Sequence, residues 1–243
     1  FWVSMRLLGA DGETVKAPPF PGHWIPLGVI SPGDVEVVQR DLVDDGQRLR
    51  LAVGGDANLG RRQNGISGMR GFEDALGRLK ALADADLAFV NLESVLSEKG
   101  QLGFPKGEKV PHYYRGRQEQ ANVLTSAGVD VVGTANNHAG DYGPDALLDQ
   151  DRILSMAGLV GVGTGATVSE ACAPKFLQRR GVTVAFVSVD TTWPLYSAAK
   201  MSPGTCFVSV KDVDASMAVL QPHLDAAREG ADVVFVAVHW GKN

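Results

Sequence analysis

Polar residues that can bind divalent metal ions follow four separate apolar segments of the chain. They are Asp56, Glu93, the neighbours Asn137 and His138, and His239. Carboxylate and amide oxygens together with imidazole nitrogens suit borderline to hard ions such as Mn²⁺, Fe²⁺, Zn²⁺ or Mg²⁺. Because these donors lie far apart in the sequence, they form one site only if the fold brings the ends of the four segments together.

The segments that must position these donors alternate between strand-like and helix-like patterns from Leu49 onward. Strands are expected at 49–53, 86–90, 129–134, 182–189 and 231–238, with a short strand and turn at 158–165. Helices are expected at 72–85, 118–127, 146–157 and 213–229. This alternation is typical of a layered α/β domain. In open α/β sheets, ligands bind outside the carboxyl ends of the strands, where the candidate donors lie.

Residues 1–48 differ from the rest of the chain. The stretch 17–33 contains five prolines, together with Gly22 and Gly28. Proline fixes φ and lacks an amide hydrogen, so this composition indicates an irregular, extended segment. We therefore expect a Pro- and Gly-rich N-terminal extension over 1–48 and a folded domain over 49–243.

Composition excludes several classes of protein. With 44% hydrophobic and 21% charged residues the chain can bury a core, which excludes a disordered or fibrous protein. The 23 Lys and Arg against 28 Asp and Glu give a net charge of −5, so the composition lacks the excess of basic residues that is typical of nucleic-acid-binding proteins. No apolar run approaches the roughly 18 residues of a membrane span, and the first residues lack the order of a signal peptide.

The chain contains two cysteines, Cys172 and Cys206. They lie far apart in unrelated contexts and lack the spacing of metal-binding cysteines. We therefore expect no disulfide framework, and a reducing cytoplasm as the location.

Four motifs, in a fixed order, carry a family resemblance. They are Gly55-Asp56-Ala57-Asn58-Leu59-Gly60-Arg61, then Asn91-Leu92-Glu93, then Ala135-Asn136-Asn137-His138 with Asp141-Tyr142-Gly143, and finally His239-Trp240-Gly241. From about Leu49 to its last residue the chain resembles the CapA-like family, named for the poly-γ-glutamate capsule protein. That family is a branch of the calcineurin-like metallophosphoesterase superfamily and includes lasso-peptide epimerases.

The resemblance implies a four-layer α/β/β/α sandwich, here incomplete at its C-terminal end, with two divalent metal ions bound at the strand ends. The sequence does not distinguish among Mn, Fe, Zn, Mg and Ca. The implied metal ligands are Asp56, Asn58, Glu93, Asn137 and His239. His138 is implied as the group that donates or accepts a proton. Arg61 and Arg115 are candidate substrate contacts because guanidinium groups bind carboxylates and phosphates in a bidentate manner. Asn91 and Asn136 complete the candidate substrate-binding set.

Structural roles compete with these functional ones. Asp56 could cap a turn, Glu93 could lie at a helix start, and His239 could be a core histidine. The segment 136–138 is harder to explain by packing, because two amides and an imidazole beside a buried strand are costly without partners.

The leading functional hypothesis is a metal-dependent enzyme acting on a peptide or polyglutamate-type substrate, by polyglutamate processing or by epimerisation of a C-terminal residue. One alternative is a two-metal phosphoesterase that hydrolyses phosphomonoesters or phosphodiesters. Another is a non-catalytic binding or assembly protein that retains the fold. The family has a Gly-His-x-Pro-His segment that supplies further histidines, and this sequence lacks one. We therefore expect a C-terminal remainder or a second chain to complete the site.

Overall fold

The computed structural model describes residues 49–61, 80–103, 105–107 and 109–241. The expected extension over 1–48 and most of the expected helix over 72–85 lie outside these residues, and the short helix α2 (Lys80–Ala83) falls at the end of that pattern. Within the described residues no helix is both long and apolar enough to cross a membrane.

The first sheet is parallel, with its strands in chain order, β1-β2-β3-β4. The strands are β1 (Leu51–Ala57), β2 (Leu87–Leu92), β3 (Val131–Gly133) and β4 (Val160–Val162). All four fall where strands were expected. Parallel neighbours need crossover connections, and helices supply them.

The second sheet has the order β6-β7-β9 and mixed direction. It comprises β6 (Lys175–Arg179), β7 (Val182–Asp190) and β9 (Val233–His239), with β6 antiparallel and β9 parallel to β7. The strands β7 and β9 were expected, whereas β6 was not, because its exposed sequence Lys-Phe-Leu-Gln-Arg lacks a buried apolar face. A further small sheet pairs β5 (Thr164–Gly165) with β8 (Gly204–Thr205).

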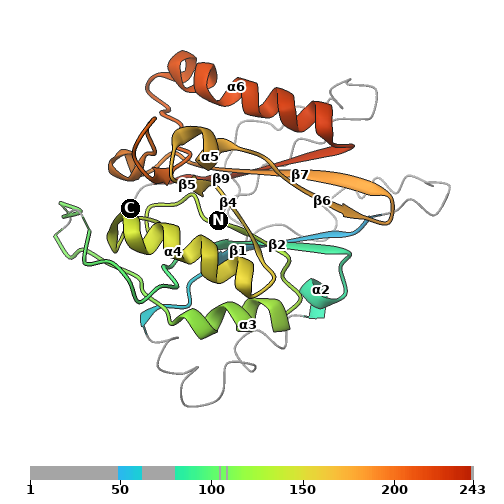
Figure 1. The fold of residues 1–243 in the computed structure, drawn as a ribbon, viewed down its shortest axis with the longest axis horizontal. Helices are drawn as coiled ribbons and strands as arrows, with labels where there is room; N and C mark the ends of the chain where they lie inside the picture. Colours follow the sequence, from blue (N-terminus) through green and yellow to red (C-terminus); the bar gives the residue numbers. More distant parts are fainter. Residues whose placement is uncertain (1–48, 62–79, 104, 108, 242–243) are drawn as a thin grey trace, which may run out of the picture. The chain divides into compact units, whose positions relative to one another are not determined.

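Helices cover the outer faces of both sheets (Figure 1). The main ones are α3 (Ala121–Ser126), which follows the 3-10 turn η3 (Gln118–Gln120), α4 (Gly143–Met156), α5 (Val168–Cys172) and α6 (Val213–Gly230). A second 3-10 turn, η4, spans Pro194–Tyr196.

Three buried clusters define four layers. Leu124 of α3 and Leu154 of α4 pack on the outer face of the first sheet, and Leu220 of α6 packs on the outer face of the second. Between the sheets, Phe89 lies against Phe186, with ring centres 6.2 Å apart. The order of layers is therefore α/β/β/α, as the family resemblance implied.

Alternate residues of the central strands enter different clusters. In β7, Phe186 faces the other sheet while Ala185 and Val187 face the helices. Because both faces are buried, these strands are continuously apolar rather than alternating with polar residues. Their apolar runs could therefore be recognised in the sequence.

The turn from β4 to β5 requires a glycine at position 163. Gly163 has φ +111°, and a Cβ atom there would lie 2.7 Å from the Cβ of Ala135 and 2.9 Å from that of Ser188. Gly163 thus makes the turn at a place where the two sheets approach each other too closely for a side chain.

The expectation of no disulfide was wrong. Cys172 and Cys206 form a disulfide, although 34 positions separate them in the sequence. The physical reason is that the last residue of α5 and the residue after β8 meet beside the second sheet, a proximity that sequence spacing does not reveal.

We predict that replacing Phe186 by alanine lowers the free energy of unfolding by about 3–5 kcal/mol, because it empties a fully buried position between the sheets. Urea denaturation followed by circular dichroism measures this. The control is Phe176→Ala on β6, where the ring is 45% exposed. Equal losses for the two variants would contradict the four-layer arrangement.

Candidate functional site

The carboxyl ends of β1 and β2 bring together the first pair of candidate residues. Val53 pairs with Phe89, but the next pair is Asp56 with Asn91, so β1 carries one extra residue between them. This bulge lies at Gly54 and Gly55 and sets Asp56 beside Asn91, whose Nδ2 donates a hydrogen bond of 2.7 Å to Asp56 Oδ1.

His239 is the last residue of β9 in the second sheet, and its side chain lies beside Asp56 and Asn91. Its Nε2 lies 3.0 Å from Asn137 Oδ1 and 3.9 Å from Glu93 Oε1. Its Nδ1 lies 3.2 Å from Asn91 Nδ2 and 3.9 Å from Asp56 Oδ1. Since Asn91 Nδ2 is a donor and Asn137 Oδ1 an acceptor, the neutral ring carries its proton on Nε2.

Asn136 holds the segment after β3 against the end of β2. It is fully buried, and its Nδ2 donates to Leu92 O at 2.9 Å and to Asn91 Oδ1 at 3.2 Å. Its Oδ1 accepts a hydrogen bond from the amide of His138. The asparagine thus uses both ends of its amide to place Asn137 and His138.

His138 is oriented by Asp141. Its Nδ1 lies 2.7 Å from Asp141 Oδ2, and its Nε2 lies 3.9 Å from Glu93 Oε1. Lys106 Nζ also lies 3.1 Å from Nδ1 and would favour a lone pair there, but the contact with the carboxylate is shorter. A nitrogen lone pair and a carboxylate oxygen repel at 2.7 Å, so the proton is on Nδ1 and the lone pair of Nε2 faces Glu93. The ring of Tyr114 stacks on the imidazole with 3.8 Å between ring centres.

Asp141 is a fully buried carboxylate with four donors. Its Oδ1 forms an ion pair of 2.7 Å with Lys106 Nζ and accepts a hydrogen bond of 3.3 Å from Tyr196 OH. Its Oδ2 accepts from the amide of Tyr114 at 2.7 Å as well as from His138. Lys106 is itself buried and also donates to the carbonyl oxygen of Asn137 at 3.0 Å.

Burial and neighbouring charges shift two proton equilibria in the site. Burial, and then the charge of Asp56, raise the pKa of Glu93 from 4.5 to about 7, with Asp141 adding to the rise and Lys106 opposing it. Burial lowers the pKa of His138, although its hydrogen bond to Asp141 opposes the change. Both shifts favour the neutral forms of these side chains in the metal-free protein.

The donor set fits a divalent ion that accepts an amide oxygen. The described residues contain no group of three or more His, Cys, Asp or Glu side chains already arranged to hold a metal. Two ligands of one ion lie about 3–4 Å apart, since metal–ligand bonds are about 2.0–2.2 Å. The oxygens of Asn137 and Glu93 have that spacing from His239 Nε2. The three groups can therefore share an ion once the ring proton of His239 has moved from Nε2 to Nδ1, which lies 3.9 Å from Asp56 Oδ1.

Comparison with known proteins identifies the family of the chain. The family model described as bacterial capsule synthesis protein PGA_cap matches residues 50–243. The chain belongs to the PGA_cap family. The matched region contains the described sheets and every candidate site residue.

Several curated proteins are similar to this PGA_cap chain. The PGA biosynthesis protein CapA of Bacillus subtilis is 27% identical over 191 residues, covering 77% of this chain and 48% of that protein. A probable polyglutamine synthesis accessory protein of Mycobacterium tuberculosis is 28% identical over 180 residues, covering 70% of this chain and 45% of that protein.

An uncharacterised protein of Sinorhizobium fredii, y4sH, is 29% identical over 130 residues, covering 53% of this chain and 28% of that protein. The PGA_cap chain therefore spans about half the length, or less, of these curated relatives.

Three residues of the candidate set lie apart from the strand-end cluster. The side-chain oxygen of Asn58 accepts a hydrogen bond of 2.9 Å from the amide of Gly60. Arg61 is exposed, with its guanidinium carbon 5.7 Å from the centre of the Tyr114 ring. Arg115 stacks on Tyr142 at 3.6 Å and donates to the carbonyl oxygen of Lys99 at 2.6 Å. The other candidates surround His239 and His138.

Lys106 and Asp141 had no role among the sequence predictions. Asp141 follows His138 by three positions within a motif already noted, which was a usable signal. Lys106 comes from a loop with no helical or strand periodicity, so no sequence pattern pointed to it.

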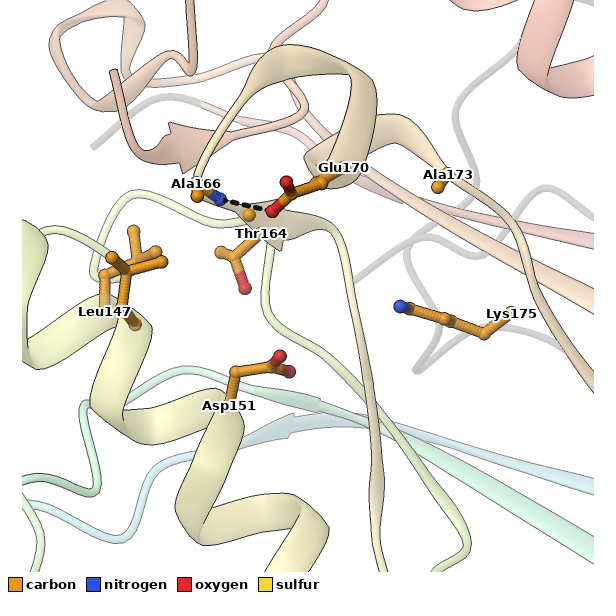
Figure 2. Close-up of a pocket in the computed structure, with 9 residues that line it drawn as sticks. Leu147, Asp151, Thr164, Ala166, Glu170, Ala173 and Lys175 are labelled. Atoms are coloured by element: carbon orange, nitrogen blue, oxygen red, sulfur yellow. Dashed lines mark hydrogen bonds between the residues drawn. The ribbon is translucent and has the colours of Figure 1, made fainter. Parts of the chain in front are cut away.

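A separate cleft of about 300 Å³ lies among α4, β5, α5 and β6 (Figure 2). Asp151 and Lys175 point into it, and Glu170 accepts a hydrogen bond of 3.0 Å from the amide of Ala166. It shares no residue with the strand-end cluster. We place the candidate site at the strand ends, where His138 and His239 meet Glu93 and Asn137.

We predict that Lys106 and Asp141 are strongly coupled in stability. Asp141→Asn should cost about 3–5 kcal/mol, because it leaves a buried lysine without its carboxylate. In a double-mutant cycle with Lys106→Met, urea denaturation should give a coupling energy of about 1–3 kcal/mol. The control cycle uses the exposed pair Asp225 and Arg228, where less than about 0.5 kcal/mol is expected. Additive losses at 106 and 141 would contradict the assignment.

We predict that Glu93 makes the metal-free protein less stable as pH rises from about 4.5 to about 7. A carboxyl whose pKa is raised by folding ionises first in the unfolded chain, so its stabilising contribution is complete below about pH 4.5 and is gone above about pH 7. Glu93→Gln should therefore raise stability at pH 8 by about 1–2 kcal/mol, less than the full shift implies because solvent screens the group, and leave it unchanged at about pH 4. Chelator-treated protein is measured by urea denaturation, with the exposed Glu98→Gln as control. A pH dependence unchanged by Glu93→Gln would refute the prediction.

Proposed function

We propose that this PGA_cap domain is a metal-dependent enzyme acting on a peptide or polyglutamate-type substrate. The observation that carries the proposal is that Asn137, Glu93 and His239 lie together at the strand ends. The lone pair of His138 Nε2 faces Glu93 in this group. The substrate class is supported by the names of relatives, which refer to PGA biosynthesis and to polyglutamine synthesis.

Bound divalent ions would supply a Lewis acid that polarises a carbonyl oxygen and lowers the pKa of bound water. Asp56, Glu93, Asn137 and His239 are the residues proposed to hold them. The chain itself contributes the proton transfer. His138 can accept a proton on Nε2, since its Nδ1 is held by Asp141 and the lone pair of Nε2 faces Glu93.

Asp141 then stabilises the imidazolium that forms. Its carboxylate lies 2.7 Å from Nδ1, so the positive ring keeps a charged partner without moving. The stacked ring of Tyr114 covers one face of the imidazole and limits its rotation.

Arg61 is the proposed contact for a substrate carboxylate. It is exposed and lies over Tyr114, which in turn stacks on His138. A polyglutamate-type chain carries regularly spaced carboxylates, and a guanidinium binds one through two parallel hydrogen bonds. Arg115 is less suited to this role, because its guanidinium already donates to backbone carbonyl groups.

We predict that His138→Gln lowers kcat by about 10²–10⁴-fold while leaving bound metal unchanged, since His138 moves a proton and is not a ligand. Asn137→Ala should lower both activity and metal content. Turnover of poly-γ-glutamate is followed by chromatography, and metal content by elemental analysis. His223→Gln on α6 is the matched control and should behave as wild type.

Further measurements on the metal-loaded protein distinguish epimerisation, hydrolysis of polyglutamate, phosphoester hydrolysis and a non-catalytic role. In deuterated water, uptake of deuterium at an α-carbon of a peptide indicates epimerisation, whereas shortened chains indicate hydrolysis. Turnover of an aryl phosphate that is lost in Asn137→Ala would favour a phosphoesterase instead. Less than one bound ion per chain with no turnover of any of these substrates would refute the enzyme proposal and favour a binding or assembly protein.

A further inference from the structure

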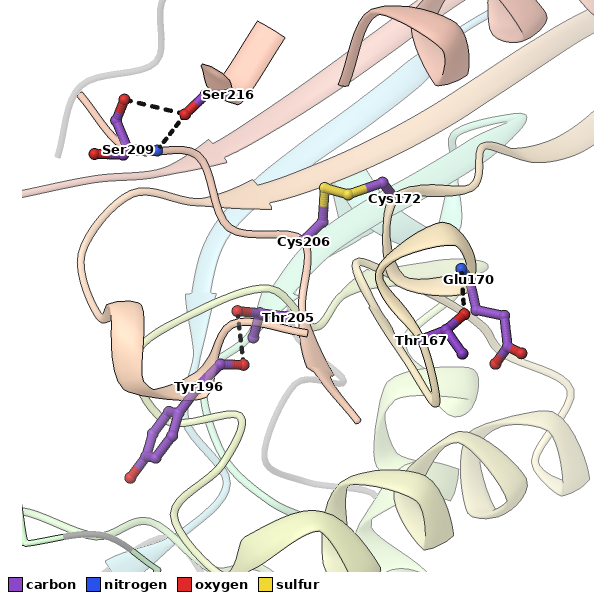
Figure 3. Close-up of a disulfide and its surroundings, with 8 residues drawn as sticks. All are labelled: Thr167, Glu170, Cys172, Tyr196, Thr205, Cys206, Ser209 and Ser216. Atoms are coloured by element: carbon purple, nitrogen blue, oxygen red, sulfur yellow. Dashed lines mark hydrogen bonds between the residues drawn. A yellow bond between two sulfur atoms is a disulfide. The ribbon is translucent and has the colours of Figure 1, made fainter. Parts of the chain in front are cut away.

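The disulfide joins two short elements beside the second sheet (Figure 3). Cys172 is the last residue of α5, and Cys206 directly follows β8. Their Cα atoms are 4.8 Å apart, within the range that a disulfide spans without moving the backbone. The described residues contain no free cysteine.

Both cysteines are buried in the core between the second sheet and its covering helices. Cys172 is 1% and Cys206 0% exposed, and they belong to one cluster with Val187, Val189 and Leu220. An accessible, strained disulfide is the kind that cells use for catalysis or sensing. A disulfide shielded in a core instead has the surroundings of a structural cross-link.

The cross-linked strand supports a residue of the candidate site. Thr205, next to Cys206, donates through Oγ1 to the carbonyl oxygen of Tyr196 at 3.2 Å and accepts a hydrogen bond from the amide of Ala198 (Figure 3). Tyr196 in turn donates through its hydroxyl to Asp141. A chain of contacts therefore runs from the disulfide through β8 to the carboxylate that orients His138.

We propose that the Cys172–Cys206 disulfide is installed during maturation in an oxidising compartment and anchors β8, and through it Tyr196, beside the candidate site. In this step the two thiols lose two protons and two electrons and form one S–S bond. A protein disulfide of a thiol–disulfide oxidoreductase accepts the electrons and becomes a dithiol.

An oxidising compartment is proposed here in place of the expected reducing cytoplasm. The expectation of a reducing cytoplasm followed from the absence of a disulfide framework, and that premise was wrong. Structural disulfides persist in oxidising compartments and are rare where glutathione and thioredoxin keep thiols reduced.

The first test locates the bond. The full chain is produced in the bacterial cytoplasm and, in parallel, exported to the periplasm, then alkylated and digested with trypsin without reduction. The periplasmic protein should yield the peptides 153–175 and 201–211 joined through Cys172 and Cys206. Cysteines alkylated in the periplasmic protein would overturn the proposal, as would equal oxidation of the cytoplasmic protein.

The second test asks what the bond does. Reductant should lower the Tm of the oxidised protein by about 5–15 °C, and should not change the Tm of the Cys172→Ala/Cys206→Ala variant. Hydrogen exchange of segment 193–208 should become at least tenfold faster on reduction, while that of β2 stays the same. Unchanged exchange in 193–208 would overturn the anchoring role, and this readout does not depend on metal binding or turnover.

Discussion

The buried carboxylate of Asp141 is the constraint on which the site depends. A charged group at zero exposure is tolerated only if it is paired and hydrogen-bonded, and Asp141 needs all four of its donors. Those donors come from the loop that carries Lys106 and Tyr114, from the turn after β3, and from the loop after β7. Satisfying one carboxylate thus holds three loops together and fixes the orientation of His138.

Sheet topology provides the rest of the arrangement. The parallel strands β1, β2 and β3 end at one edge, and β9 ends opposite them in the second sheet, so residues more than 100 positions apart come within hydrogen-bonding distance. The phenylalanines between the sheets set the separation of the two edges. His239 can therefore contact both Asn91 and Asn137 without leaving its strand.

Much of the fold could be predicted from the sequence, because the buried strands are short apolar runs. Several of these runs end in or next to a polar residue, which marked the edge of the sheet where the candidate site lies. The convergence of Asp56, Asn91, Glu93 and His239 followed from the same pattern. Lys106 could not be found, because its partners are set by loop packing rather than by periodicity. The disulfide was missed for a similar reason, as Cys172 and Cys206 meet only after α5 and β8 have folded onto the second sheet. The catalytic, metal-binding and substrate-binding roles of all the candidate residues, Asn58, Arg61 and Arg115 included, remain predictions.

We propose that the strand ends of both sheets together bind divalent metal. Anomalous diffraction from crystals of the protein soaked in Mn²⁺, recorded on both sides of the manganese absorption edge, tests it most directly. The account predicts an anomalous peak bounded by Glu93, Asn137 and His239, and its loss in His239→Ala crystals. No peak at this place, or a peak that persists in His239→Ala, would contradict the account.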